Sequence, residues 1–302
     1  MMALLTDALL PNLVQTTEGV PALVHAGPFG NIAHGTCSVI SQQMGLRLAD
    51  YVVNEAGFAG DLGAEKYIDI VTRISGVNPA AAVLVTTVQS LRNQGEGALE
   101  KGFANLARHI DNLRRFGLPT VVAVNRFPHD TDDELRQVGA FCAEHGVLSA
   151  LAEPFTRGGA GCEELARTLV DLIDRSGPVT AQPVYALSDT YEEKLNKVAM
   201  AIYGAEGVTF SDLARQKLRQ IVDWGYDGLP ICVAKTQYSF SDNPKLLGAP
   251  TGWTLHITDV SLAAGAEFVV TIAGNMMLMP GLPKVSRAEE IDVDEAGEIV
   301  GV

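Results

Sequence analysis

The sequence lacks long apolar runs, paired cysteines and clustered histidines. Its apolar runs, such as 80–85 and 121–124, are far shorter than the roughly 20 residues that a membrane-spanning helix needs. The four cysteines are too widely spaced for a CxxC pair or a zinc site, as in a cytosolic protein with reduced thiols. Residues 1–7 show no basic region before their apolar residues, so we expect a cytoplasmic protein without a secretory signal.

Positive charge is also scarce. The chain has 22 Lys and Arg against 36 Asp and Glu, a net charge of −14. An acidic chain repels nucleic acids and anionic lipid surfaces, so we expect neither a nucleic acid nor a membrane as a partner. The six histidines form no HxH or HExxH pair, and no GxSxG or GxxxxGK[ST] motif occurs. A dedicated metal site and a phosphate-binding loop are therefore not expected.

What remains is a globular composition in which short β-branched runs alternate with amphipathic stretches. The predicted strands are 22–25, 51–54, 81–87, 120–125, 147–150, 184–186, 231–234, 254–259 and 268–272. The predicted helices are 98–116, 131–144, 161–175 and 189–203, the last with Asp189 as its cap, and a further helix ends at Trp224.

The early strands are apolar throughout, which is typical of a parallel sheet covered on both faces. We therefore predict an α/β fold with a doubly wound, mostly parallel sheet, followed by a smaller C-terminal α+β part. The last two strands are close enough in sequence to pair antiparallel. A linker at 178–183 suggests a boundary between domains 1–178 and 179–302.

Two glycine-containing segments follow predicted strands. Segment 25–38 carries Asn31 and His34, and such turns let backbone N–H groups approach an anion, although a purely structural turn explains the glycines equally well. Segment 54–66 carries Glu55 and Lys66 at the carboxyl end of a strand, where open α/β sheets bind ligands. The alternative for that segment is an acid-capped helix start. The polar loop 234–244 is a third candidate, and the apolar segment 276–284 is a candidate for core or interface packing.

Two aromatic residues follow neighbouring strands. Asn125 and Phe127 come after one strand, and Glu153 and Phe155 come after the next. Two rings on adjacent loops could clamp a flat heterocycle while the polar groups fix its edge. The alternative is that each phenylalanine packs beneath its own loop.

Several of these segments resemble formate–tetrahydrofolate ligases, also called 10-formyltetrahydrofolate synthetases. The matching motifs are PNLVQT at 11–16, GPFGNIAHG at 27–35, EAGF at 55–58, DLGAEK at 61–66, AKTQYS at 234–239, MPGLPK at 279–284 and IDVD at 291–294. The likeness is collinear over nearly the whole chain and corresponds to the C-terminal half of that family.

The resemblance implies a folate site. The family joins formate to tetrahydrofolate with ATP through a formyl phosphate, and it stacks the pterin between two aromatic rings. The matching positions are Phe127 and Phe155, the second usually a tryptophan, with Asn125 or Glu153 near the pterin edge. Asn31, His34, Glu55 and Lys66 are then the expected catalytic cleft residues. Tetrahydrofolate or 10-formyltetrahydrofolate is the expected ligand.

The chain also departs from the family. The family's P-loop lies upstream of the region that matches, and in segment 88–97 Gln89 and Gln94 replace an arginine and a histidine. Use of ATP by this chain alone is therefore not expected. Three hypotheses stay open: a formyl-folate enzyme with altered chemistry or completed by a partner chain, a non-catalytic folate-binding or regulatory protein, and a truncated ATP-dependent ligase. The Met1-Met2 start and the altered segment 88–97 favour a natural short chain. Because the missing half would cover apolar surface, we expect a homo-oligomer or a partner chain.

Overall fold

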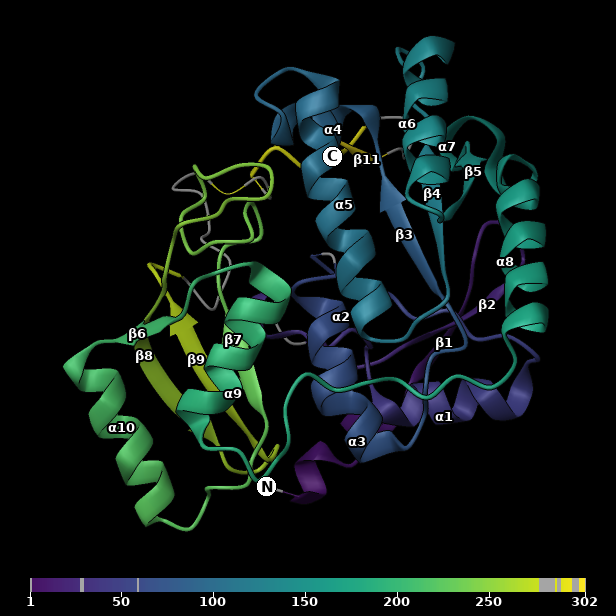
Figure 1. Ribbon diagram of the computed structural model, residues 1–302. Helices are drawn as coiled ribbons and strands as arrows, with labels where there is room; N and C mark the ends of the chain where they lie inside the picture. Colours follow the sequence, from purple (N-terminus) through teal and green to yellow (C-terminus); the bar gives the residue numbers. More distant parts are fainter. Residues whose placement is uncertain are drawn as a thin grey trace.

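A computed structural model describes residues 2–27, 30–58, 60–276, 286, 289–294 and 299–301 (Figure 1). The MPGLPK segment at 279–284 lies outside these residues, and of the apolar segment 276–284 they include Met276 alone. The predicted α/β fold is confirmed, with a parallel sheet in the first part of the chain and a mixed sheet in the second. Within the described residues, no helix is both long and apolar enough to cross a membrane.

The first sheet is parallel, in the order β3-β4-β5. Its strands are β3 (Ala82–Thr86), β4 (Thr120–Asn125) and β5 (Leu148–Ala152). Helices α4 (Val88–Gln94), α5 (Leu99–Arg115) and α6 (Asp132–Glu144) connect them, and α7 (Pro154–Arg157) and α8 (Glu163–Ser176) follow β5. The apolar stripe of α5 is buried as its spacing predicts, with only Phe103 partly exposed.

The second sheet has the order β6-β8-β9-β7. Its strands are β6 (Val208–Phe210), β7 (Ile231–Ala234), β8 (Leu255–Ala263) and β9 (Phe268–Ala273). β8 and β9 pair antiparallel, as predicted, whereas β6 and β7 run parallel to their neighbours. Helix α9 (Tyr191–Val198), which continues as a π-helical turn (Ala199–Tyr203), and α10 (Asp212–Asp223) pack on this sheet.

The first 75 residues carry little sheet. A hairpin of β1 (Asn12–Gln15) and β2 (Pro21–Val24) follows the 3-10 turns Met2–Leu5 and Asp7–Leu9. After a 3-10 turn (Gly30–Ile32) and α1 (Val39–Leu48), one continuous helical stretch contains α2 (Gly63–Lys66), a π-helical turn (Tyr67–Val71) and α3 (Thr72–Ser75). Short helical turns also occur at Gly158–Cys162, and β10 (Asp292–Val293) pairs with β11 (Ile299–Val300) near the end.

Three local predictions were wrong. Residues 51–54 and 184–186 are not strands, because 51–54 meets no neighbouring strand and the Val184 N–H donates to Asp69 Oδ1 instead (2.8 Å). The cap of α9 is Thr190, which exchanges hydrogen bonds with Glu193 in a capping box. Asp189 instead accepts from the Ala186 N–H (2.8 Å) and pairs with Lys197.

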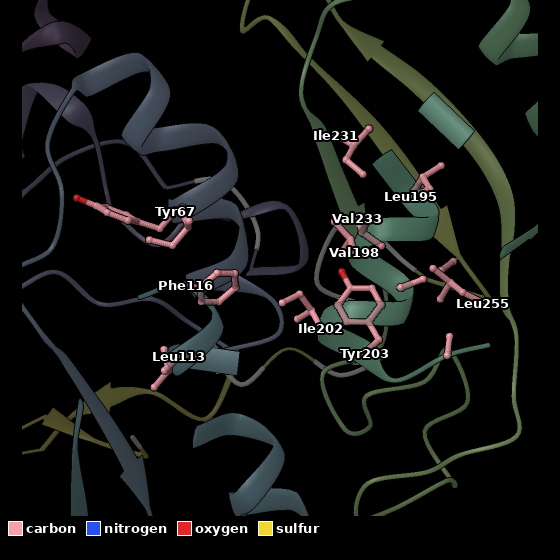
Figure 2. Close-up of a cluster of buried hydrophobic side chains, with 14 of the residues drawn as sticks. Tyr67, Leu113, Phe116, Leu195, Val198, Ile202, Tyr203, Ile231, Val233 and Leu255 are labelled. Atoms are coloured by element: carbon pink, nitrogen blue, oxygen red, sulfur yellow. The ribbon is translucent and has the colours of Figure 1, made fainter. Parts of the chain in front are cut away.

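One hydrophobic cluster joins the two sheets. Figure 2 shows Tyr67, Leu113 and Phe116 on one side and Ile202 and Tyr203 on the other. All five side chains are at least 94% buried. The helical stretch 63–75 and the end of α5 therefore pack against the π-helical turn Ala199–Tyr203, which covers the second sheet. We call this contact the junction, and polar groups in it are shielded from water.

Candidate functional site

The glycine-rich turn and segment 54–66 lie against each other. Gly35 has a φ of +75°, and a Cβ on it would lie 2.6 Å from Gly63 O and 2.9 Å from Tyr67 Cβ. The Gly63 N–H in turn donates to Gly57 O (3.1 Å). A close backbone approach therefore fixes the turn on the start of the helical stretch, and this explains why both segments need glycine.

Replacing Gly35 with alanine is expected to lower the free energy of unfolding by roughly 3 kcal/mol, combining backbone strain with the clash against Gly63 O. Gly76→Ala is the matched control, because Gly76 has a similar φ of +69° but open space around its Cβ position. Its loss should be about 1–2 kcal/mol. Equal losses for the two variants in urea unfolding would contradict the proposed close approach.

Of the predicted cleft residues, Lys66 is fully buried and His34 is partly buried, close enough for the charge of Lys66 to act on the imidazole. Burial, followed by the charge of Lys66, lowers the pKa of His34 to about 4, so the imidazole is neutral at physiological pH. Its Nε2 has no hydrogen-bond partner among the described residues, and its ring meets Phe268 edge-on at 4.6 Å. Asn31 lies in the adjacent 3-10 turn, whereas the Glu55 side chain is exposed. A neutral His34 can accept a hydrogen bond from a ligand.

A buried ion pair joins two of the candidate segments. Lys235, at the end of β7, places Nζ 2.7 Å from Asp61 Oδ2, and both side chains are almost fully buried. The same ammonium donates to Ser239 O (2.6 Å) and Thr236 O (3.2 Å). Sequence reasoning marked both segments as candidates but missed this pair. The available signal was a lysine directly after an apolar strand.

Two buried carboxyl groups lie one turn apart on the helical stretch. Burial, reinforced by the negative charge of Asp69, raises the pKa of Glu65 well above its usual range. Burial also raises the pKa of Asp69 to about 6, although Asp69 accepts the Val184 N–H and lies 3.6 Å from the Arg73 guanidinium. Both carboxyl groups therefore hold their protons more tightly than exposed carboxyl groups do.

The four predicted folate residues lie at or just beyond the carboxyl ends of β4 and β5, with Asn125 ending β4 and Phe155 in α7. Asn125 pairs in register with Ala152, and the next residue, Arg126, donates its N–H to Ala152 O (2.8 Å). The Arg126 guanidinium also lies 3.9 Å from Glu153 Oε1. The edge of the parallel sheet thus brings the two loops together, as strand topology predicts.

The two rings on these loops differ in exposure. Phe127 is half-buried, with its N–H bonded to Asp130 Oδ2 (2.8 Å) and its ring stacked at 6.1 Å on His129. Phe155 is 80% exposed, so it does not pack beneath its own loop. The Asn125 Oδ1 is buried without a hydrogen-bond partner among the described residues. A cavity of about 450 Å³ adjoins the segment after β5 and contains neither phenylalanine in its lining, which is formed by Leu151, Glu153, Arg157, Ala160, Gly161, Glu163, Glu164, Arg167, Thr168 and Asp171.

The altered segment 88–97 contacts the polar loop that follows β7. Gln94 accepts from the Gly248 N–H (2.9 Å) and donates to Tyr238 O (3.1 Å). Asn105 of α5 supports the same loop by donating to Gly248 O (2.9 Å). Gln94 therefore tethers the loop that carries Lys235 and Ser239, while Gln89 is exposed.

Comparisons with known proteins agree with these features. A family model for formate–tetrahydrofolate ligase matches residues 1–302. Proteins with that name from Methylobacterium nodulans, a Nocardioides species and Symbiobacterium thermophilum are 50%, 51% and 48% identical over 314 aligned positions. Each alignment covers 100% of this chain but 56% of the relative, so the chain spans about half the length of these relatives. The chain belongs to the formate–tetrahydrofolate ligase family.

Proposed function

We propose that this chain supplies the folate-binding part of a formate–tetrahydrofolate ligase and binds tetrahydrofolate or 10-formyltetrahydrofolate. The pterin lies between Phe127 and Phe155, with Asn125 and Glu153 at its polar edge. Two features at one edge of the sheet carry the proposal: the exposed Phe155 ring after β5 and the buried, unpartnered Asn125 Oδ1 at the end of β4, where Asn125 pairs in register with Ala152. An exposed aromatic ring next to unsatisfied polar atoms suits a flat heterocycle with hydrogen-bonding edges.

The second part of the proposal concerns chemistry. His34 lies in the turn 27–35, and its neutral imidazole, whose pKa burial and the charge of Lys66 lower, is available to accept a hydrogen bond from a reacting group. Asn31 lies within this turn, and Glu55 belongs to the segment 54–66 that packs against it. No GxxxxGK[ST] loop occurs in the 302 residues, so we assign ATP-dependent ligation to this chain only in company with the remainder of the ligase.

A binding titration and a product assay together separate folate binding from turnover. Calorimetry with tetrahydrofolate should give saturable binding, while formate, ATP and tetrahydrofolate together should give no 10-formyltetrahydrofolate with this chain alone. Product formation without a second polypeptide would contradict the proposal that this chain needs the remainder of the ligase for ATP-dependent ligation. Absence of folate binding would overturn the proposed function itself. Binding without turnover, even when the remainder of the ligase is added, would favour a non-catalytic folate-binding protein.

Phe155→Ala is expected to weaken tetrahydrofolate binding about 5- to 150-fold, since loss of one stacked ring removes roughly 1–3 kcal/mol by analogy with nucleobase stacking. The fold should be unaffected because this side chain is 80% exposed. Phe127→Ala should weaken binding over the same range. Trp224→Ala is the control, an exposed ring at the end of α10, and should leave the calorimetric Kd unchanged. Unchanged affinity in both phenylalanine variants would rule out the stack.

A further inference from the structure

The helix that carries Phe155 is not held in place by burial. Every side chain in α7 is exposed, and neither α7 nor the following 3-10 turn Gly158–Cys162 contains a buried residue. The hydrogen bonds at its base are local, with the Glu153 N–H donating to Gly161 O (3.0 Å) and Arg157 pairing with Glu153 (3.1 Å). A segment with few buried contacts opens easily unless other interactions hold it. The position of the Phe155 ring therefore depends on polar contacts.

One such contact comes from the hairpin of β1 and β2. Glu18 lies in the turn of this hairpin, 141 residues before Gly159, and its Oε1 accepts the Gly159 N–H (2.9 Å). Among the described residues, this is the one hydrogen bond that joins 154–160 to a part of the chain outside 153–167. Hydrogen bonds to a carboxylate are stronger than those between neutral groups. Glu18 is therefore the long-range anchor of this segment.

Gly158 and Gly159 shape the turn around this carboxylate. A Cβ on Gly158 would clash with Glu18 Oε1, and a Cβ on Gly159 would lie 3.2 Å from Glu18 Oε2. Gly158 also has a φ of +55°, a conformation that residues with a side chain rarely adopt. Both oxygens of the carboxylate therefore lie against the two glycines, and the backbone of the turn fits closely around them.

Helix α7 is thus held at both ends. Its start adjoins β5, and the carboxylate of Glu153 there lies 3.9 Å from the Arg126 guanidinium of the neighbouring loop. Gly159, which Glu18 holds, lies four residues after Phe155, or about one helical turn. Release of the Glu18 contact would free the end of this short helix and, with it, the ring.

We propose that Glu18 is a positioning residue for the folate site and acts through Phe155. Its carboxylate fixes the end of α7 in the free protein, so that the ring is in place before the pterin arrives. Ordering a loop or a side chain on binding costs affinity, and a ring that is ordered beforehand avoids this cost. The inference rests on the proposed function, because it requires a pterin stacked on Phe155.

Calorimetric titration of the complete 302-residue chain with tetrahydrofolate tests this role. Glu18→Ala should weaken binding about 3- to 10-fold, the effect expected from loss of one hydrogen bond. Glu18→Gln should bind like the parent, because its amide oxygen can still accept the Gly159 N–H. Thr17→Ala is the matched control, since Thr17 is exposed in the same turn and its side chain makes no hydrogen bond to a described residue. All three variants should keep the unfolding midpoint of the parent.

A double-mutant cycle separates positioning from a direct role of Glu18. In a Phe155→Ala background, Glu18→Ala should weaken binding no further, because a residue that acts through the ring loses its effect when the ring is absent. Hydrogen exchange at the Gly159 amide of the free chain should also be faster in Glu18→Ala than in the parent or in Glu18→Gln.

Three results would overturn the inference and leave the proposed function intact. They are a Glu18→Ala variant that binds as tightly as the parent, equal losses of affinity with and without Phe155, and a loss of affinity that is accompanied by a lower unfolding midpoint. No tetrahydrofolate binding by the parent would instead refute the proposed function, and the role of Glu18 in pterin binding with it.

Discussion

Lys235→Met should lower the free energy of unfolding by roughly 3–5 kcal/mol, because removing one partner of a buried ion pair leaves the other charge uncompensated. Lys235 is fully buried, and its ammonium contacts Asp61 at 2.7 Å and the carbonyl oxygens of Thr236 and Ser239. Methionine fills the space but offers no donor. Asp61, the two carbonyl groups and the neighbouring His109 would then face each other without a cation at this point of the junction.

Urea unfolding followed by circular dichroism measures this loss. Lys217→Met is the matched control, because Lys217 lies 2.5 Å from Asp259 but both side chains are more than one-third exposed. It should change the free energy of unfolding by no more than about 1 kcal/mol. Adding Asp61→Asn to Lys235→Met should restore part of the stability by removing the stranded charge. Similar losses for the two lysine variants would refute the special role of the buried pair.

Asp69→Asn should gain stability relative to the parent protein as the pH rises from about 4 to 7. The folded-state pKa of Asp69 is raised from 3.8 to about 6, so the folded parent holds this proton more tightly than the unfolded chain does. The associated stability is fully present below about pH 4 and is lost as the pH rises through about 6. That difference corresponds to roughly 3 kcal/mol. Asparagine stays neutral and keeps an oxygen for the Val184 N–H.

The measurement is the difference in unfolding free energy between variant and parent at several pH values. Asp259→Asn provides a control of opposite sign. Burial tends to raise the pKa of Asp259, but the hydrogen bonds from Lys217 and the Val260 N–H outweigh it and lower the pKa. This variant should therefore lose stability relative to the parent as the pH rises from 3. A pH-independent difference for Asp69→Asn would show that the carboxyl titrates normally in the folded protein.

Local patterns in the sequence predicted the elements whose surroundings are uniform. Strands 120–125 and 231–234 match β4 and β7. Their residues are apolar apart from Thr120 and Asn125 at the two ends of β4, and nearly all of them are buried. The same composition at 51–54 forms no strand, since no neighbouring strand is available there. Strand β6 was missed because its three residues, Val208–Phe210, are too few to show a period.

In the candidate site, too, some features could be predicted from the sequence and others could not. Its loops could be predicted, because strand ends and glycine positions are local features. The Lys235–Asp61 pair could not, because its two residues meet only through packing of the second sheet on the helical stretch 63–75. The burial of Glu65 was equally hidden, since an acid near a helix start usually faces solvent. Tertiary packing, rather than spacing, decides the charge state of these groups.

The hairpin of β1 and β2 contacts a segment that lies far from it in the sequence. At its tip, Glu18 Oε1 accepts the Gly159 N–H (2.9 Å), which belongs to the turn directly after the helix that carries Phe155. The hairpin is exposed along β1, and Glu18 ties its tip to the turn beyond α7. A change that displaces the hairpin therefore also removes a hydrogen-bond acceptor from the turn beside the helix that carries Phe155.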